Sequence, residues 1–431
     1  MGRSPGPGAV GMPRGSGAAA GEGCGCRGGS HGRDGGAASG GGSQGRGGGG
    51  RTCGQAESRA RPDEGESTFR ESAGPETGLR RGMPAMMGGR FGIEADNPNR
   101  GEILRLKEQL QVAVCEHVRR DGAVALVDFP MYANVGDSAI WLGQERILAE
   151  SGISVAYRSP LPCLVERPGH VRQVLYSGGG NLGDVWPEVD ERRRRQLMLW
   201  REIPSLMFPQ SIYFKDRGAW RRAREEYRAA GELTVFVRDD DSLERGAELF
   251  GSVPRLVPDA AFGLGPLSRT TRPRTDILVL ARRDREQKEN VRRELRALGL
   301  RATDWVTERA ATGLRALQWS ERLLARYPAK LRVLARGRGL LMRRAAAERL
   351  VRGLDMLSQG AVVVTDRLHG HVLCALAGIP HVIVDNDNGK VGAFWRRWTR
   401  GFEGSRLAGS LQEALDVARQ MAGTRAITAV G

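Results

Sequence analysis

Cysteines, aromatic residues and long apolar runs are all scarce in this 431-residue sequence. Its six cysteines include no CxxC pair, and three of them fall within the first 53 residues. This pattern predicts neither a zinc site nor a disulfide framework, and it favours a reducing compartment. The sequence has no run of about 18 apolar residues, which a membrane-spanning helix needs, and it begins without the apolar stretch of a secretory signal. We therefore expect a cytoplasmic protein without a transmembrane helix.

Lysine is scarce as well, whereas arginine is abundant. The chain has 61 arginines and 5 lysines, and its formal net charge is +16. A basic protein favours anionic partners. Nucleic-acid binding would require basic residues interleaved with exposed aromatic side chains, but aromatic residues make up only 6% of this chain and mostly fall within expected strands and helices. We therefore expect no nucleic-acid partner, and an anionic partner of another kind.

Residues 1–95 form a low-complexity segment. Glycine accounts for 22 of the first 50 residues, and the segment shows no apolar periodicity. Such a composition cannot bury enough apolar surface to offset the entropy lost on ordering. The segment is expected to be a disordered Gly/Arg-rich tail, or the product of a start codon assigned too early, with Met83, Met86 or Met87 as the true first residue. A flexible RNA-binding tail is the less favoured alternative.

Beyond the tail, short apolar runs alternate with segments of helical period. Expected strands include 123–130, 153–157, 172–176, 204–211, 233–239, 254–257, 276–280, 362–365 and 381–386. Expected helices include 102–118, 134–152, 192–203, 217–231 and 241–250. This alternation predicts an α/β fold with parallel sheets. We expect two Rossmann-like lobes facing a cleft, at 100–265 and 272–400, followed by a C-terminal helix and tail at 401–431.

Polar loops follow many of the expected strands. In an open parallel sheet, ligands bind beyond the carboxyl ends of the strands. The loops are 134–137, 177–184, 209–211, 238–239, 258–259, 282–284 and 366–369. Taken singly, each has a structural explanation: a helix N-terminus for Asp137, a tight turn for Gly178–Gly180, a solvated face for Arg282 and Arg283, and an ion pair for Asp366 and Arg367. Together they predict a cleft for a small, doubly anionic ligand beside a hydroxylated partner.

The same loops, read in order, carry a family resemblance. The motifs are N-x-G-D (134–137), S-G-G-G-N-x-G-D (177–184), F-P-Q-S (208–211), V-R-D (237–239), P-D (258–259), A-R-R-D-x-E (281–286), T-D-R-L-H-G-H (365–371), G-I-P (378–380) and D-N-x-x-G-K (385–390). Their order and spacing resemble the polysaccharide pyruvyl transferase family over about residues 100–400. Gly389-Lys390 and Phe394-x-x-x-Trp398-Thr399 resemble its exopolysaccharide, succinoglycan-type branch.

The resemblance implies a fold similar to GT-B glycosyltransferases and a donor, phosphoenolpyruvate, whose pyruvyl group becomes a cyclic ketal on two sugar hydroxyls. By resemblance, the donor is held by Arg282 or Arg283, Arg367, the Leu368 backbone and His369. Arginines suit a ligand that carries both a carboxylate and a phosphate. Histidine titrates near neutral pH, so His369 is the expected general acid that protonates the enol carbon. We expect His371 to be a packing residue.

The expected acceptor site contains Asn134, Asp137, Gly179, Asn181, Asp184 and Gln210. Asp137, Asp184 or Asp259 could bind sugar hydroxyls or remove their protons, and the sequence does not choose among them. No carboxylate–histidine cluster has the spacing of metal ligands, so we expect neither a metal nor a cofactor. The chain reads D-N-D-N-G-K at 385–390, where exopolysaccharide members tend to read D-N-S-Y-G-K, and this departure bears on the acceptor sugar more than on the donor.

Residues 316–350 mix apolar residues and arginines with helical spacing. The segment is expected to be a surface helix or, alternatively, a basic amphipathic face in peripheral contact with the inner membrane surface. Membrane contact would suit a lipid-linked saccharide acceptor, which the family suggests. The rival function is a GT-B-type glycosyltransferase, which would bind a nucleotide-sugar and ignore phosphoenolpyruvate.

Overall fold

The structure is a computed structural model that describes residues 97–160, 171–283, 289–298, 302–306, 319, 332–385 and 389–428. The expected tail at 1–95 lies outside these residues. The strands are β1 (Ala123–Val127), β2 (Val155–Ser159), β3 (Val171–Tyr176), β4 (Gly179–Gly183), β5 (Ser205–Tyr213), β6 (Leu233–Val237), β7 (Arg255–Leu256), β8 (Thr275–Leu280), β9 (Gly360–Thr365), β10 (His381–Val384) and β11 (Ser405–Ala408).

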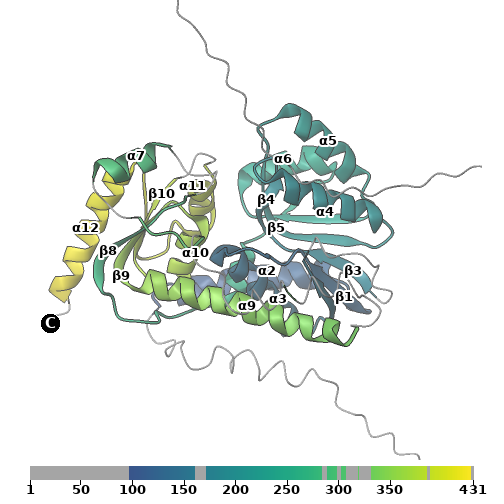
Figure 1. The fold of residues 1–431 in the computed structure, drawn as a ribbon, viewed down its shortest axis with the longest axis horizontal. Coiled ribbons are helices and arrows are strands. Elements are labelled where there is room, and N and C mark those ends of the chain that lie inside the picture. Colours follow the sequence, from purple (N-terminus) through teal and green to yellow (C-terminus); the bar gives the residue numbers. More distant parts are fainter. Residues whose placement is uncertain are drawn as a thin grey trace, which may run out of the picture. The chain divides into compact units, whose positions relative to one another are not determined.

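Helices connect these strands (Figure 1). They are α2 (Arg100–His117), α3 (Val135–Glu150), α4 (Pro187–Leu199), α5 (Arg217–Arg228), α6 (Asp240–Phe250), η2 (Ala260–Leu264), α7 (Glu289–Ala297), α9 (Arg332–Ser358), α10 (Leu368–Leu376), α11 (Lys390–Phe394), η3 (Trp395–Thr399) and α12 (Leu411–Thr428). None of the helices in the described part of the chain has the length and hydropathy of a membrane span.

The strands form two parallel sheets, so the predicted α/β class is confirmed. The first sheet has the order β2-β1-β3-β5-β6-β7, with β4 beside β5, and the second has the order β11-β10-β9-β8. Every pairing between these strands is parallel. In parallel strands that are covered by helices on both faces, apolar runs are nearly continuous, which is why strands such as 123–127 were readable from the sequence.

The glycine-rich segment after β3 is a strand, where the sequence predicted a loop. Gly179–Gly183 forms β4, which runs parallel to the end of β5. A Cβ atom at Gly183 would lie 1.8 Å from the carbonyl oxygen of Tyr213, so a side chain there would prevent the two backbones from pairing. Glycine in a strand often marks such a close backbone approach. Likewise, the predicted polar turn at 209–211 lies inside β5.

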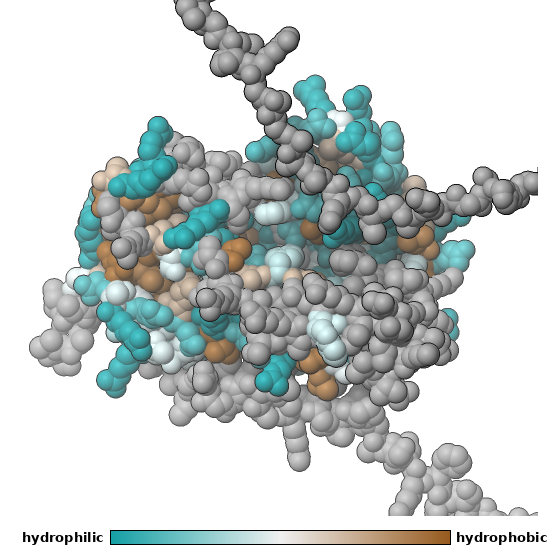
Figure 2. Space-filling model, viewed as in Figure 1, coloured by the Kyte–Doolittle hydropathy of each residue, from teal (hydrophilic) through white to brown (hydrophobic). Residues whose placement is uncertain are grey.

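Helix α3 is the most buried helix of the first half of the chain and packs against both η2 and α9. The buried apolar residues of α3 belong to one apolar cluster that also includes Leu126 of the first sheet and Val363 of the second. Helix α5 is different: it buries Ala223 and Tyr227 and exposes Arg221 and Arg222. Figure 2 shows this region as mainly hydrophilic.

The described part of the predicted basic segment at 316–350 lies mainly in α9, whose side chains are described from residue 337 onward. Arg338 and Arg349 are buried there, and Arg343 lies 3.6 Å from the buried Glu145 carboxylate. Arg344 is exposed. Arg338, Arg343 and Arg349 therefore contact the protein interior, and contact with a membrane stays a prediction. The C-terminal segment also supplies a strand that the sequence did not predict, because β11 pairs with β10.

Candidate active site

A cavity of about 390 Å³ lies where several strand ends and helix starts meet. Its lining comprises Tyr132, Asn134, Asp137, Gly180, Asn181, Trp186, Glu188, Val189, Arg238, Arg282, Trp305, Val306, Arg367, Leu368, His369 and Lys390. Both sheets contribute, since Arg238 directly follows β6 and Arg367 follows β9. The location agrees with the rule that ligands bind beyond the carboxyl ends of parallel strands.

Helix α3 presents its N-terminus and one carboxylate to this cavity. The side chain of Asn134 caps the helix by accepting a hydrogen bond from the Gly136 amide at 3.0 Å, as N-cap residues do. The other side-chain group of Asn134, its amide Nδ2, donates to Asp137 Oδ2 at 2.8 Å. Asp137 is therefore held in place from within its own helix turn while it lines the cavity.

Tyr132 and Asn181 extend this polar network across the cavity. Asn181 Nδ2 donates to the Tyr132 hydroxyl at 3.0 Å, and the same hydroxyl interacts with the Asp137 carboxylate. The network joins the loop after β1, the start of α3 and the strand β4. It arranges hydroxyl, amide and carboxylate groups of the kind that bind sugar hydroxyls.

The start of α10 supplies the opposite side of the cavity. Leu368 and His369 occupy its first turn, and the free backbone N–H groups of a helix N-terminus can bind an anion. The Arg367 guanidinium lies 2.8 Å from the buried Asp304 carboxylate and over the Trp305 ring, with its Cζ atom 5.7 Å from the ring centroid. Asp366 accepts a hydrogen bond from the Arg282 backbone at 2.8 Å, which joins the end of β8 to the end of β9. The structural explanation offered by the sequence was an ion pair between Asp366 and Arg367, whereas in the structure Arg367 pairs with Asp304 and Asp366 accepts from the Arg282 backbone.

His369 is backed by a buried ion pair. Its Nε2 lies 3.5 Å from Asp259 Oδ2, and the same carboxylate oxygen accepts a 2.5 Å hydrogen bond from Arg238. Burial raises the pKa of Asp259, but the charges of His369 and Arg238 lower it more, so the pKa of this carboxyl lies well below its usual range. Asp259 is therefore ionised near neutral pH, and it can balance the charge of a protonated imidazole.

Gly136 explains how His369 comes so close to α3. A Cβ atom at residue 136 would lie 2.4 Å from Nδ1 and 2.5 Å from Cγ of His369. Real side chains do not tolerate such distances, so the ring occupies the space that the missing side chain leaves. The glycine in the N-x-G-D motif thus serves the contact between α3 and α10.

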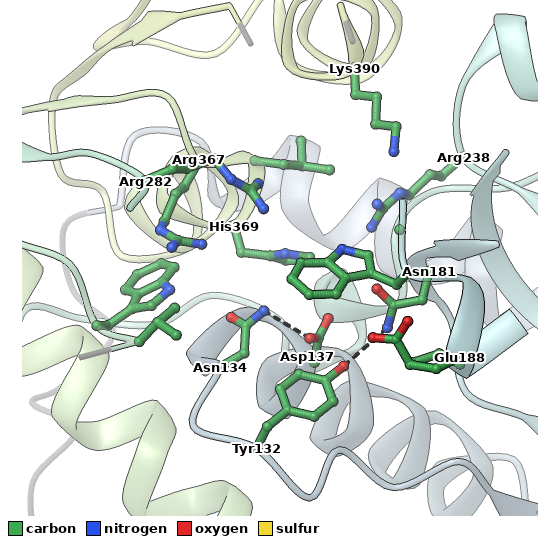
Figure 3. Close-up of a pocket in the computed structure, with 16 residues that line it drawn as sticks. Tyr132, Asn134, Asp137, Asn181, Glu188, Arg238, Arg282, Arg367, His369 and Lys390 are labelled. Atoms are coloured by element: carbon green, nitrogen blue, oxygen red, sulfur yellow. Dashed lines mark hydrogen bonds between the residues drawn. The ribbon is translucent and has the colours of Figure 1, made fainter. Parts of the chain in front are cut away.

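The cavity is divided by charge. Figure 3 shows Arg282, Arg367 and Lys390 on one side and Asp137 and Glu188 on the other, with His369 between them. Arg238 also lies toward the cationic groups. One cavity therefore offers a cationic side for an anion and a side of carboxylate, amide and phenol groups for a hydroxylated molecule.

The structure brings seven of the predicted site residues to the cavity. They are Asn134, Asp137, Asn181, Arg282, Arg367, Leu368 and His369. Asp259 does not line the cavity but contacts His369 from behind.

Four predicted residues lie elsewhere. Arg283 is exposed, and its side chain donates to the Ala302 carbonyl at 2.7 Å. Gln210 is buried and donates to the Ser177 carbonyl, and Asp184 accepts the amide hydrogens of Lys215 and Asp216. Gly179 lies next to the lining residue Gly180, and its missing Cβ leaves room near Asp137 Oδ1. These residues shape the strands around the cavity instead of lining it.

Several lining residues were missing from the predicted site. Arg238 and Lys390 lie in motifs that the sequence did reveal, but neither was assigned to the site. Tyr132 lies just beyond the expected strand 123–130 but outside the motifs, and Trp186, Glu188, Val189, Trp305 and Val306 lie outside the polar loops that mark the strand ends. Their role depends on how the chain folds back, so only the structure identifies them.

The described residues contain no group of three or more His, Cys, Asp or Glu side chains that could hold a metal ion. The expectation that no metal is required stays a prediction. The two cysteines in the described ranges, Cys115 and Cys374, are not in a disulfide.

Comparison with known proteins agrees with the motifs. The family model "Polysaccharide pyruvyl transferase" matches residues 134–388. The chain is 30% identical over 306 residues to "Pyruvyl transferase 1" of Schizosaccharomyces pombe, covering 64% of this chain and 70% of that protein. It is 26% identical over 314 residues to "Putative pyruvyl transferase EpsO" of Bacillus subtilis, covering 71% and 94%. A solved structure of an uncharacterised Klebsiella pneumoniae protein has a TM-score of 0.47 and 14% identity, over 71% of this chain and 99% of its own.

Proposed function

Because the chain belongs to the polysaccharide pyruvyl transferase family, we propose that it transfers the pyruvyl group of phosphoenolpyruvate onto two hydroxyls of a sugar as a cyclic ketal. The observation that carries the proposal is the division of one cavity into a cationic side and a side of carboxylate, amide and phenol groups, with His369 between them. A donor with two anionic groups and an acceptor with hydroxyls would fit these two sides.

The donor would lie on the cationic side. Phosphoenolpyruvate carries a carboxylate and a phosphate on a three-carbon unit, so it needs several positive groups close together. Arg282, Arg367 and Lys390 line this side, and the amides of the first turn of α10 add neutral donors. Arginine pairs with carboxylate and phosphate by two parallel hydrogen bonds, and a helix N-terminus favours anions.

His369 would supply the proton that starts the reaction. Transfer of a proton from the imidazole to the methylene carbon turns that carbon into a methyl group and leaves a cation-like centre at the neighbouring carbon. One sugar hydroxyl attacks this centre and loses its proton, the bond to phosphate breaks, and the second hydroxyl closes the ring. The sugar gives up two protons: one balances the proton that the methyl group gained, and the other leaves with phosphate. Asp259 would hold the ring in place throughout.

The acceptor would lie against Asp137, Tyr132 and Asn181. Asp137 is oriented by Asn134 and Tyr132, which is the arrangement expected of a general base that must reach a hydroxyl. Trp186 and Glu188 line the same region and would contact the sugar ring and its hydroxyls. Of the three carboxylates that the sequence left open, Asp137 is therefore the candidate base, since Asp259 faces His369 and Asp184 holds backbone amides.

We also propose that the two sheets form two lobes in a GT-B-like arrangement, and that the enzyme acts in exopolysaccharide biosynthesis on a lipid-linked acceptor at the inner membrane surface. Two contacts between the parts that contain the two sheets support the first point: His369 with Asp259, and Trp398 with the Arg238 carbonyl. Resemblance to the exopolysaccharide branch supports the second. No cofactor is needed for the steps above.

The test is binding of phosphoenolpyruvate to the full chain, measured by calorimetry. Adjacent residues provide a matched pair: Arg282 lines the cavity, whereas Arg283 donates to the Ala302 carbonyl outside it. We expect Arg282→Ala and Lys390→Ala to weaken binding at least tenfold and Arg283→Ala to leave it within about twofold. A well-folded parent that ignores phosphoenolpyruvate and binds a nucleotide-sugar would refute the proposal and favour the rival glycosyltransferase.

A further inference from the structure

Trp398 forms a hydrogen bond from the segment between β10 and β11 of the second sheet to the residue that follows β6 of the first sheet, beside the cavity. It lies in η3, a π-helical segment that continues α11, and its indole Nε1–H donates to the carbonyl oxygen of Arg238 at 2.8 Å. Arg238 directly follows β6. π-helical segments are rare and occur frequently at functional sites. The reaction steps proposed above give Trp398 no role.

The backbone that Trp398 contacts carries a cavity residue. The Arg238 side chain is 3% exposed, donates from Nε to Ser211 Oγ at 2.9 Å, and pairs with Asp259 behind His369. Its own amide donates to the Gln210 carbonyl at 3.1 Å. Trp398 satisfies the carbonyl of the same residue, so the Arg238 backbone is held from both sides.

The same end of η3 is fixed to α10 by three buried side chains, those of Thr399, His371 and His381. His381 Nδ1 lies 2.7 Å from the Ile379 carbonyl, which can only accept, so this nitrogen carries a proton. In a neutral ring Nε2 of His381 then accepts from His371 Nδ1 at 2.7 Å, and His371 Nε2 accepts from the Thr399 hydroxyl at 2.7 Å. Thr399 follows Trp398 directly, and His371 lies two residues after His369.

Segment η3 is thus connected to three parts of the cavity. Through Thr399 it is joined to α10, which begins with the donor-side residues. Through α11 it continues from Lys390, and through Trp398 it reaches Arg238. A second contact also joins η3 to the region after β6, since Arg397 lies 3.8 Å from Asp240, the first residue of α6. This pair is exposed, so it contributes little by itself.

We propose that Trp398 is a positioning residue for the donor site: its indole N–H fixes Arg238, and through Arg238 it fixes Asp259 and His369 relative to the start of α10. The inference rests on the proposed function, because it concerns the same donor site. It adds that the geometry of this site depends on a residue outside the cavity lining. Loss of the indole N–H would leave the chemical groups of the cavity unchanged but would align them less well.

The chain offers a matched control for this proposal. Trp395 lies on the same π-helical segment and donates its indole N–H at 2.8 Å to Ser405 Oγ. Ser405 is the first residue of β11, so this hydrogen bond ends within the second sheet. Trp398→Phe and Trp395→Phe therefore remove the same group from the same segment, and only the first removes a contact to Arg238. Three quantities are measured for both: the dissociation constant of phosphoenolpyruvate, the melting temperature, and amide hydrogen exchange across residues 233–243.

We expect Trp398→Phe to weaken phosphoenolpyruvate binding roughly three- to tenfold and to speed exchange in 233–243, with a melting temperature close to that of Trp395→Phe. Trp395→Phe should bind like the parent and leave that exchange unchanged. Equal affinity and equal exchange in the two variants would overturn the proposal.

Two further outcomes keep the inference separate from the function. If the parent chain does not bind phosphoenolpyruvate, the proposed function fails, and exchange in 233–243 still decides whether Trp398 holds Arg238. If Trp398→Phe does not fold, Trp398→Leu takes its place with Trp395→Leu as its control, because these changes also remove the indole N–H groups and add no other donor. Faster exchange in 233–243 then supports the proposal, and unchanged exchange contradicts it.

Discussion

His369, in the first turn of α10, lies with Nε2 3.5 Å from Oδ2 of Asp259, the residue that caps η2. The two residues are 110 positions apart in the sequence, and each follows a strand of a different sheet. The carboxylate is 0% exposed and is shared with Arg238. A histidine that lines a cavity and is backed by a buried carboxylate is oriented by it, as in other enzymes that use a positioned imidazole.

Asp259→Asn should abolish most of the activity. Asparagine keeps the shape of the side chain but removes the charge that faces His369 and Arg238. We expect the transfer rate to fall at least about a hundredfold and the free energy of unfolding to fall by about 3 kcal/mol, because Arg238 loses its buried partner. Transfer kinetics and urea unfolding measure the two effects. Asp416→Asn, at an exposed site on α12, is the control.

The lowered pKa of Asp259 also predicts a pH dependence. A carboxyl whose pKa is lower in the folded state stabilises the protein fully above the pKa of the unfolded chain, which is about 4. Its contribution is lost as the pH falls below that value. The stability difference between the parent and Asp259→Asn should therefore be constant near neutral pH and shrink below about pH 4. A difference that shrinks near pH 6 instead would contradict the assignment.

Gly136→Ala should lower the activity without loss of stability from the helix itself. The added Cβ would overlap the His369 ring, so the ring must move. A displacement of about 1 Å at a catalytic group can cost about a hundredfold in rate, and we expect a loss of at least tenfold. Gly101 occupies the equivalent second position of α2 and has open space around it. Gly101→Ala should therefore leave activity unchanged, and equal rates in both variants would show that the ring is not displaced.

The sequence allowed the parallel α/β fold to be predicted because strands buried on both faces appear as continuous apolar runs. The rule that ligands bind beyond strand ends also selected Asn134, Asp137 and His369, all three of which line the cavity. The rule could not separate Arg282 from Arg283, because side-chain alternation is lost once a strand ends. Both follow β8, and only the backbone path decides which one faces the cavity.

Other residues could not be predicted for tertiary reasons. Trp305 and Glu188 reach the cavity only because distant segments fold together, and nothing local marks them. The glycines of β4 were interpreted as a loop because glycine permits turns, whereas here they allow two strands to approach. Asp184 belongs to the same motif, yet its oxygen Oδ2 accepts two backbone amides at 2.6 Å each.

Asp137 lines the cavity, whereas Asp184 accepts two backbone amides outside it. This difference between the two carboxylates allows a direct test of the acceptor side. Asp137→Asn should bind phosphoenolpyruvate within about twofold of the parent but transfer it about a hundredfold more slowly, because Asp137 is the proposed base. Asp184→Asn should leave the transfer rate near that of the parent and reduce stability by about 1 kcal/mol, since it weakens contacts to backbone amides. Binding and transfer are measured separately. Loss of donor binding in Asp137→Asn would move this residue to the donor side.

The pair His371 and His381 predicts a second pH dependence, in stability. Both rings are fully buried in the contact between α10, β10 and η3. Burial, together with the neighbouring His381 and His369, lowers the pKa of His371 well below its usual range, and burial lowers the pKa of His381 to about 4. Between about pH 6.5 and pH 4 the unfolded chain binds protons at these residues, whereas the folded chain leaves them largely neutral.

Stability should therefore fall as the pH decreases from about 6.5 toward 4, by about 2 kcal/mol per histidine between pH 7 and pH 5. Urea unfolding at a series of pH values measures this slope. The double variant His371→Leu/His381→Leu removes both titrating groups and should flatten the slope, even if its stability at pH 7 differs. Because the rings join η3 to α10, protonation in the parent should also weaken the segment that carries Trp398. An unchanged slope in the double variant would assign the pH dependence to other groups.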